Sequence, residues 1–232
     1  MMQSLSANFA KLYLHDLNPD EAGDTILHSF IICDKEEDAL NIIDAYPHLV
    51  QIQNNLYQTP LHLAVLMQHH RVVSQLLTKS VDVNMMDHNG NTPLHLACLY
   101  ELYSMVDLLL LSRGNDWNVR NYDGYTCLQL AVECDNAGIV ELLLSSDETG
   151  ILFGHGKSGR SAVHFAVDNG NEKILALLLA RCTEDLNVYH RDFAGNTPMD
   201  LACGRNNTTI QKMLVKYDED LSLSHLMRPV TP

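Results

Sequence analysis

A heptapeptide recurs along this chain, and its repetition constrains the possible folds more than any other feature. Two copies, at residues 59–65 and 92–98, begin Thr-Pro-Leu-His-Leu-Ala, and the others keep the same pattern of polar and apolar positions. The copies begin at Thr25, Thr59, Thr92, Thr126, Ser161 and Thr197, which lie 34, 33, 34, 35 and 36 residues apart. A phrase repeated at this spacing predicts a stack of similar units, each of which buries its apolar face against its neighbours.

Each copy carries the signals of a helix start. Its Thr or Ser can accept a hydrogen bond from a backbone N–H, and the Pro that often follows loses nothing by lacking its own N–H. About ten residues later come paired apolar residues, such as Val72-Val73 with Leu76-Leu77, which predict the buried face of a second helix. The period and the signature are those of the ankyrin repeat. The sequence therefore predicts an all-α ankyrin-repeat solenoid of about six helix–turn–helix repeats with β-hairpin fingers.

The repeats also predict the domain organisation. We expect an N-terminal flank over residues 1–20, an ankyrin-repeat domain over residues 21–217 with repeats starting near residues 23, 57, 90, 124, 159 and 195, and a short acidic tail over residues 218–232. Glycine stands at five of the six repeat starts, where a hairpin tip requires a positive φ. Tyr57 takes this place in the second repeat, and we expect Asn54-Asn55 to supply the left-handed residue there.

The charge of the chain excludes several classes of ligand. It has 15 Lys+Arg against 29 Asp+Glu, a formal net charge of −14, and no run of basic residues. Such a chain repels phosphate, so nucleic acids and anionic membranes are not expected partners, whereas basic proteins are attracted. The N-terminal segment lacks the apolar block of a signal peptide, and the longest apolar runs are far shorter than the roughly 20 residues of a membrane helix. We therefore expect a cytoplasmic or nuclear protein whose six cysteines are reduced core thiols.

Twelve histidines raise the question of a metal or catalytic site. Four of them share one position of the repeat, namely His28, His62, His95 and His164, and Gln129 and Asp200 stand there in the other two copies. A side chain that recurs once per repeat predicts a structural hydrogen bond between neighbouring hairpins rather than a titrating group. The pair His69-His70 lacks a third ligand for zinc, and no catalytic or phosphate-binding motif occurs. The sequence thus predicts no enzyme, no metal and no cofactor.

Acidic residues gather near the N-terminus. Between Asp16 and Asp44 there are nine acidic residues against one basic residue, Lys35. This group is either an ordinary solvated face or a cradle that binds a basic peptide through charge-assisted hydrogen bonds. Residues 218–220 form a second, smaller acidic group. Two acidic ends with a more neutral middle suit one extended basic partner.

Several phrases resemble one family within the ankyrin proteins, the IκB inhibitors of Rel/NF-κB transcription factors, which include the insect inhibitor Cactus. Residues 53–65, QNNLYQTPLHLAV, are similar to that family's second repeat, including its departure from glycine at Tyr57. Residues 118–124, NVRNYDG, resemble the fourth repeat of Cactus, and residues 156–161, GKSGRS, the family's fifth. Gly204-Arg205 and residues 208–211 resemble its last repeat. The resemblance spans about residues 20–217.

The resemblance implies which residues contact a partner. In this family the first two repeats hold the basic nuclear-localisation segment of a Rel subunit, and the later repeats grip the Rel dimerisation domains. Acids of the first repeat would bind that segment, and aromatic residues near a hairpin tip would be anchors. Cys203 replaces a contacting aromatic residue of the family. Together with the second acidic group, the candidate partner-binding residues are Glu21, Asp24, Asp34, Glu36, Glu37, Asp38, Trp117, Tyr122, Asp218, Glu219 and Asp220.

These features predict a non-enzymatic, IκB-like inhibitor, monomeric when free, that binds Rel/NF-κB dimers and keeps them in the cytoplasm and off DNA. Signal-responsive members of the family carry Asp-Ser-Gly-x-x-Ser, which this sequence lacks, so we expect an inhibitor that resists signal-induced degradation. A truncated inhibitor, a constitutive cellular form and a viral mimic that suppresses immune transcription all agree with this expectation. The alternatives are a nuclear co-regulator that rides on DNA-bound Rel dimers and a generic ankyrin adaptor.

Overall fold

The structure, a computed structural model, describes residues 18–112, 114–116, 118–145, 154–181 and 188–226, with side chains as far as residue 219. The chain divides between Tyr122 and Asp123 into two compact units, unit 1 (residues 1–122) and unit 2 (residues 123–232). The sequence predicts one domain over residues 21–217. In a repeat array each repeat contacts only its neighbours, so a division between two repeats leaves each unit with its own core.

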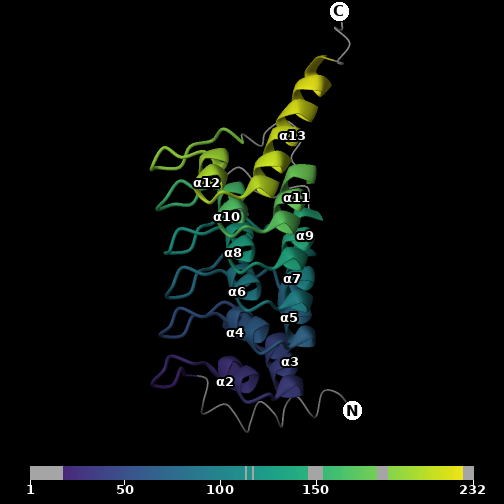
Figure 1. The fold of residues 1–232 in the computed structure, drawn as a ribbon. Helices are drawn as coiled ribbons and strands as arrows, with labels where there is room; N and C mark the ends of the chain where they lie inside the picture. The colour runs from purple at the N-terminus through teal and green to yellow at the C-terminus, as the bar shows by residue number, and fades with distance from the viewer. Residues whose placement is uncertain (1–17, 113, 117, 146–153, 182–187, 227–232) are drawn as a thin grey trace, which may run out of the picture. The chain divides into compact units, whose positions relative to one another are not determined.

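Each unit consists of three successive pairs of helices (Figure 1). Unit 1 contains α2 (Ile26–Ile32) with α3 (Glu36–Ala45) and the 3-10 turn η1 (Pro47–Leu49), α4 (Pro60–Leu66) with α5 (His70–Leu77), and α6 (Pro93–Leu99) with α7 (Tyr103–Leu110). Unit 2 contains α8 (Cys127–Glu133) with α9 (Ala137–Ser145), α10 (Ala162–Asp168) with α11 (Glu172–Arg181), and α12 (Pro198–Gly204) with α13 (Thr208–Leu226). The described residues thus confirm the predicted all-α ankyrin-repeat fold.

The first helix of each pair begins where the heptapeptide predicts. In α4, the Thr59 hydroxyl accepts a hydrogen bond from the backbone N–H of His62 at 3.4 Å, and Pro60 occupies the first helical position. The same type of cap begins α6, α8 and α12. These first helices are only seven residues long, well below the ~12–15 residues at which an isolated helix becomes stable in water. Their stability therefore comes from packing against neighbouring helices.

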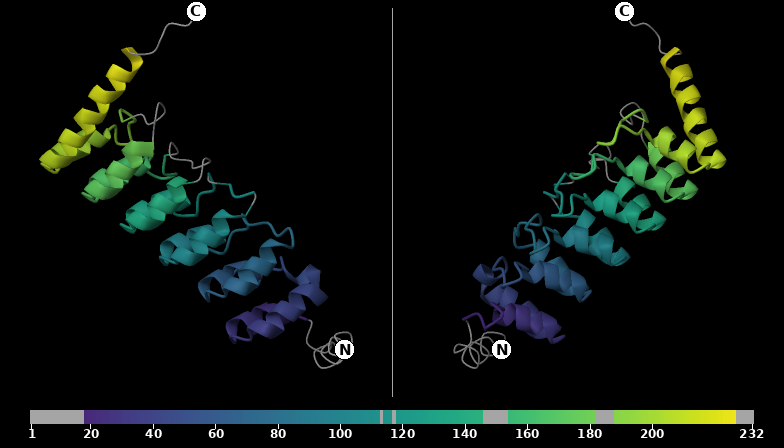
Figure 2. Two further views of the ribbon diagram at one scale, coloured as in Figure 1. Left: turned by 90° about the vertical axis from the view of Figure 1, so that its right-hand side faces the viewer. Right: turned by 60° about the vertical axis from the view of Figure 1, so that its left-hand side comes forward.

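A finger-like turn precedes each first helix (Figure 2). In the third finger, the Asp87 carboxylate accepts hydrogen bonds from the backbone N–H groups of Asn89 and Asn91 at 2.8 Å each, and Gly90 has a φ of 76°. The glycines at the equivalent place of the other fingers also have positive φ, as predicted. The described part of the chain contains no β-strand, so these fingers reverse the chain as hairpins do but lack a two-stranded ladder.

The prediction for the second finger is wrong. Tyr57 itself, and not Asn54 or Asn55, takes the left-handed conformation, with a φ of 57°. The Asn54 amide oxygen accepts a hydrogen bond from the backbone N–H of Gln58 at 2.9 Å, and the Gln53 amide donates to the Tyr57 carbonyl at 2.7 Å. Asparagine at the base of the turn therefore sets the same geometry as Asp87 does, and the residue at the glycine position must adopt a positive φ.

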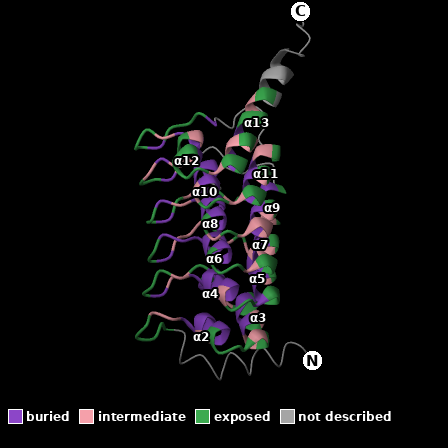
Figure 3. Ribbon diagram, viewed as in Figure 1, coloured by how far each residue is buried: buried purple, intermediate pink, exposed green. Residues whose placement is uncertain are grey.

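The core of each unit lies between its first and second helices (Figure 3). The predicted apolar doublets are part of it, because Val72, Val73 and Leu76 of α5 are all 0% exposed. Ala64 and Ala97 of the repeated phrase are also completely buried, and their small side chains let neighbouring first helices approach closely. In the described part of the chain, no helix has the length and apolar character needed to cross a bilayer.

α13 continues without a break through residues 218–220, so the acidic group at the end of the repeats lies in a helix. The prediction for the cysteines needs correction. Not all cysteines are core thiols: Cys98 and Cys127 are buried, whereas Cys33 and Cys203 are exposed, and Cys182 lies outside the described residues. Burial raises the pKa of the Cys127 thiol to about 12, which keeps it protonated and unreactive.

Candidate functional site

In α2, α4 and α10, the recurrent histidine joins the first helix of its repeat to the finger of the next repeat. His62 Nδ1 accepts the backbone N–H of Thr59 at 3.1 Å, so the proton lies on Nε2, which donates to the carbonyl of Asn91 at 3.0 Å. His28 and His164 each donate in the same way to a carbonyl of the next finger, at 3.1 Å. Burial disfavours the charged imidazole and lowers the pKa of all three histidines. The predicted structural role is confirmed.

Glutamine performs the same function in the fourth repeat. The backbone N–H of Thr126 donates to the Gln129 amide oxygen at 3.1 Å, and the Gln129 amide nitrogen donates to the carbonyl of Arg160 at 3.3 Å. This position therefore requires one acceptor and one donor at fixed places, not a group that titrates. These histidines therefore belong to the scaffold, and the finger tips that they support carry exposed side chains.

Backbone hydrogen bonds hold the finger tips of each unit in a row. In unit 1, the N–H groups of residues 55, 88 and 122 donate to the carbonyls of residues 22, 56 and 89, each at 2.9 Å. In unit 2, those of residues 156 and 193 donate to the carbonyls of residues 124 and 158 at 2.8 Å. The tip side chains of each unit are thus presented at a fixed spacing on one side of the helices.

The predicted anchor Tyr122 stands at the tip of the fourth finger with 66% of its surface exposed. Its ring lies over Gly90 of the preceding finger, so closely that a Cβ on Gly90 would be 2.6 Å from the ring carbon Cδ1. The other predicted anchor, Trp117, lies outside the described residues.

Further exposed side chains at finger tips are absent from the sequence prediction. Phe193 is 75% exposed and covers Gly159 as Tyr122 covers Gly90, and Leu56 and Tyr57 are 50% and 60% exposed at the tip of the second finger. Alignment of the repeats would have identified Phe193, because it follows the acid at the base of its turn as Tyr122 follows an asparagine.

The structure separates the predicted acids of the first repeat into two groups. Glu21 and Asp24 belong to the first finger, before α2, whereas Asp34, Glu36, Glu37 and Asp38 follow α2. The seven residues of α2, at 1.5 Å rise each, place roughly 10 Å between the two groups. They are therefore not one compact cluster.

The charged side chain of Asp24 also forms a hydrogen bond within the protein. Its carboxylate accepts a hydrogen bond from the Asn54 amide at 2.8 Å, as the Asn91 amide oxygen accepts one from Asn121 at 2.9 Å in the third repeat. Glu21, at the tip of the same finger, is exposed, and no ion pair of its side chain exists among the described residues. In the first finger, the Glu21 carboxylate is thus fully available to a partner, whereas the Asp24 carboxylate is available only in part.

Most acids of the second group already face a basic side chain one repeat away. Arg71 of α5 lies 2.5 Å from Glu37 and 3.5 Å from Glu36, and His69 Nε2 lies 3.0 Å from the Asp34 carboxylate. Farther along α3, Asp44 pairs with Lys79 at 2.7 Å. Asp38 forms no ion pair among the described residues.

The second acidic group lies on α13. Asp218 accepts a hydrogen bond from the Tyr189 hydroxyl at 2.5 Å, and Glu219 is exposed. The side chain of Asp220 lies outside the described residues. Nothing in the described part of unit 2 joins these acids to another predicted site residue.

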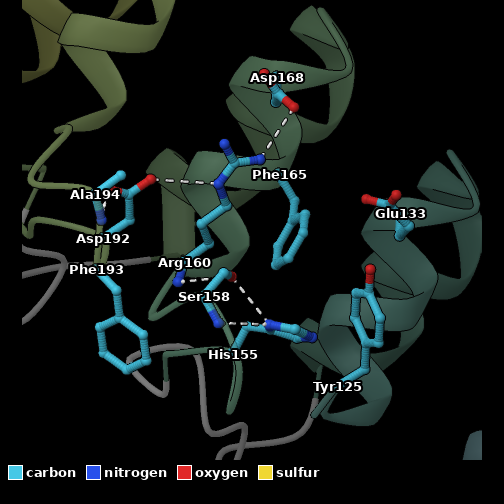
Figure 4. A pocket seen from close by; sticks show the side chains of 10 residues that line it. All are labelled: Tyr125, Glu133, His155, Ser158, Arg160, Phe165, Asp168, Asp192, Phe193 and Ala194. Carbon is cyan, nitrogen blue, oxygen red and sulfur yellow. Dashed lines mark hydrogen bonds and ion pairs between the residues drawn. The ribbon is translucent and has the colours of Figure 1, made fainter. Parts of the chain in front are cut away.

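A pocket of about 440 Å³ lies in unit 2, where the fifth and sixth fingers meet the first helices (Figure 4). It is lined by aromatic, acidic and basic side chains from several segments: Tyr125, Glu133, His155, Ser158, Arg160, Phe165, Asp168, Asp192, Phe193 and Ala194. Arg160 donates hydrogen bonds to Asp168 at 3.2 Å and to Asp192 at 3.4 Å. The sequence prediction contains none of these residues, because they come together only when three repeats stack.

No group of His, Cys, Asp or Glu side chains in the described part of the chain could hold a metal ion. The features described so far in the two units are exposed finger tips, acidic side chains and the pocket of unit 2.

Family models agree with the fold. A model of three ankyrin repeats matches residues 34–121 and 148–225, and a single-repeat model matches residues 123–150. Among solved structures, the ankyrin repeat domain of Bcl-3, titled a unique member of the IkappaB protein family, is 32% identical and has a TM-score of 0.77, over 85% of this chain and 87% of that chain.

Curated relatives point to the same group. The B-cell lymphoma 3 protein of Homo sapiens is 33% identical over 214 residues, which are 89% of this chain and 46% of that protein. The NF-kappa-B inhibitor cactus of Drosophila melanogaster is 31% identical over 242 residues, 91% of this chain and 48% of that protein. This chain therefore spans less than half the length of these relatives. The chain belongs to the ankyrin-repeat family and, as its sequence predicts, is similar within that family to IκB proteins.

Proposed function

We propose that this protein is an IκB-like inhibitor that binds Rel/NF-κB dimers, covers their basic nuclear-localisation segment and keeps them in the cytoplasm and off DNA. The observation that carries the proposal is the similarity, at 31% to 33% identity over about nine tenths of the chain, to the NF-kappa-B inhibitor cactus and to the B-cell lymphoma 3 protein. The fold supports it, because rows of rigid finger tips offer an extended surface for a large partner.

Electrostatics supports a basic partner for unit 1. Glu21, Asp24 and Asp38 have no ion pair among the described residues, so a Lys-rich or Arg-rich segment would meet negative charge that is not already neutralised. Asp34, Glu36 and Glu37 would contribute less, since His69 and Arg71 compete for them. The proposed contact is therefore narrower than the whole acidic region between residues 16 and 44.

A binding titration with matched charge variants tests this proposal. One variant carries Glu21→Gln, Asp24→Asn and Asp38→Asn, and Asp24→Asn keeps the amide oxygen that Asn91 uses at the equivalent position. The control carries Asp82→Asn, Asp107→Asn and Asp116→Asn, three exposed acids elsewhere in unit 1. Both have a net charge of −11, three less negative than −14. Affinities for a Rel-homology dimer, with and without its basic localisation segment, are measured at two salt concentrations.

We expect the first variant to bind more weakly than the control, and only when the localisation segment is present. A loss of about three- to tenfold, roughly 0.65–1.4 kcal/mol in total, lies in the lower part of the range expected for three exposed ion pairs that contribute ~0.2–1 kcal/mol each. Equal affinity of the two variants would contradict the acidic contact in unit 1. Failure of the unmodified protein to bind any Rel dimer would overturn the proposed function itself.

Resistance to signal-induced degradation is a separate part of the proposal. This 232-residue polypeptide lacks the Asp-Ser-Gly-x-x-Ser motif of signal-responsive IκB proteins. We expect its amount in stimulated cells to stay constant while an IκB protein with the motif is lost. Rapid loss of both proteins after stimulation would contradict this part.

A second candidate function is a co-regulator that stays on DNA-bound Rel dimers. Its support is the similarity to the B-cell lymphoma 3 protein over 89% of this chain and the TM-score of 0.77 to the Bcl-3 domain. A mobility-shift assay separates the two functions. An inhibitor releases the Rel dimer from its DNA site, whereas a co-regulator forms a slower complex that contains all three components.

A further inference from the structure

The pocket of unit 2 has the composition of a site for a planar cation. Its walls are rings that contact one another: Tyr125 and Phe165 lie 5.5 Å apart between ring centroids, and His155 lies 4.3 Å from Tyr125 and 5.7 Å from Phe165. Phe193, 75% exposed, lines the pocket on the side of the sixth finger (Figure 4). Aromatic faces attract cations, and a guanidinium can also stack on them.

The charged groups leave a negative balance at the mouth of the pocket. Arg160 is shared between Asp168 and Asp192, and Arg205 lies 2.6 Å from Asp168. Two arginines therefore stand against three acids, because Glu133 is exposed at the rim and has no ion pair among the described residues. The local balance is −1, and Glu133 is the carboxylate open to a ligand.

The environment of Tyr125 shows that this charge reaches into the pocket. Burial, followed by the negative charges of Glu133 and Asp123, raises the pKa of its phenol. In Figure 4 the Tyr125 hydroxyl points toward Glu133, so the aromatic wall and the carboxylate face the same space. A ligand that stacks on the ring would bring its positive end to Glu133.

We infer that this pocket receives an arginine side chain of the protein that binds unit 2. An arginine fits both features at once, since its plane stacks on an aromatic wall while its N–H groups donate to the Glu133 carboxylate. A lysine would satisfy the charge without the stacking, and a glutamate or aspartate would be repelled by the acids at the rim. The inference rests on the proposed function, because it names a contact that a Rel dimer would make with the last three repeats.

Single substitutions with a matched control test the pocket. Glu133→Gln removes the open carboxylate but keeps its size, and Phe193→Ala removes one wall. Glu141→Gln is the control, because Glu141 is exposed on α9 of the same repeat and its loss changes the net charge equally. We expect Glu133→Gln and Phe193→Ala to weaken binding of a Rel dimer about tenfold, and Glu141→Gln to leave it unchanged. Equal affinities of Glu133→Gln and Glu141→Gln would overturn the pocket while leaving the proposed function intact.

A second measurement needs no Rel protein. It distinguishes failure of the pocket inference from failure of the proposed function. The chain, labelled with ¹⁵N, is titrated with N-acetyl-arginine amide and, separately, with N-acetyl-lysine amide, and amide shifts are followed by NMR. We expect arginine to shift the signals of the fifth and sixth fingers more than lysine does, and Glu133→Gln to abolish the difference. Shifts that are absent, spread over the whole chain or equal for both probes would overturn the inference, even if Rel dimers bind.

Discussion

Acid should destabilise unit 1 through two buried histidines, and exchange of these histidines for glutamine should remove the effect. His28 and His62 are neutral bridges whose Nδ1 atoms accept backbone N–H groups, so protonation at Nδ1 would set two donors against each other. Burial lowers the pKa of both in the folded state. Their contribution to stability is therefore complete above their unfolded pKa of about 6.5 and is lost as pH falls toward the lower, folded pKa.

The size of the effect follows from proton linkage. Between pH ~6.5 and the lower, folded pKa the unfolded chain binds up to one more proton per histidine than the folded chain, so the free energy of unfolding falls by at most about 1.36 kcal/mol per pH unit for each residue. Between about pH 7.5 and pH 5.5 the pair can remove up to roughly 2.7 kcal/mol. This is a large part of the ~5–15 kcal/mol that stabilises a typical domain.

The chain itself suggests the variant for this test. Gln129 makes the same two hydrogen bonds at this repeat position without a titrating group. We therefore compare His28→Gln/His62→Gln with a control, His48→Gln/His88→Gln, which replaces two exposed histidines of unit 1. Urea denaturation is followed by far-ultraviolet circular dichroism at several pH values.

The unmodified protein and the control should lose stability in parallel as pH falls, because exposed histidines have little effect on the folded state. The bridge variant should lose up to roughly 2.7 kcal/mol less over the same interval. Other acid-sensitive groups act equally in all three proteins and cancel in the comparison. If the bridge variant keeps the full pH dependence, the two histidines are not the neutral bridges described above, and the reasoning fails.

Three further perturbations test other parts of the structure. Gly90→Ala should destabilise the protein by about 2–4 kcal/mol, because a Cβ at this positive φ would also meet Tyr122. Gly195 has the same type of φ but open space around it, so Gly195→Ala should cost only about 1 kcal/mol. Thermal unfolding measures both changes. Tyr57→Gly should raise the free energy of unfolding by up to about 1 kcal/mol, and with it the melting temperature, since glycine relieves the strain of a φ of 57°. An unchanged melting temperature would contradict strain at this tip. Arg71→Ala should leave the free energy of unfolding nearly unchanged, because its ion pairs with Glu36 and Glu37 are exposed to solvent. The same substitution should strengthen binding of a basic peptide, measured by fluorescence anisotropy, and weaker binding would refute the competition described for this side chain.

The fold was predictable from the sequence because repetition multiplies each weak signal. A single Thr-Pro pair is a modest indication of a helix start, but the same phrase at six places with one period leaves few alternatives. Tyr57 is where this reasoning failed. The position in the repeat, fixed by Asn54 at the base of the turn, determined its conformation more strongly than its own intrinsic preference did.

The candidate site was less predictable, because contacts between repeats decide which side chains are available. The pocket of unit 2 joins Tyr125, Phe165 and Phe193 from three successive repeats, and none of the three is unusual within its own repeat. For the acidic region the sequence prediction made the opposite error, because it counted as available some side chains that contacts between repeats neutralise. A count of nine acids against one base within residues 16–44 ignores the bases of the next repeat, at residues 69–79, which pair with acids of the first.

The period of the repeat gives a rule that corrects this count. Glu37 and Arg71 are 34 residues apart, Asp44 and Lys79 are 35 apart, and in unit 2 Lys157 pairs with Asp123 at a separation of 34. Equivalent positions of neighbouring repeats face each other, so an acid is neutralised when a base stands one period later.

The same rule identifies the acids that remain available to a partner. One period after Glu21 stands Asn55, and one period after Asp24 stands Gln58, neither of which is charged. Asp38 is followed one period later by an apolar residue of α5. A basic segment can therefore bind these three acids without displacing a base of the protein. They are the three acids that are replaced in the binding test. If exchange of Glu36 and Glu37 weakened Rel binding more than exchange of these three, ion pairs between repeats would not govern the charge available to the partner.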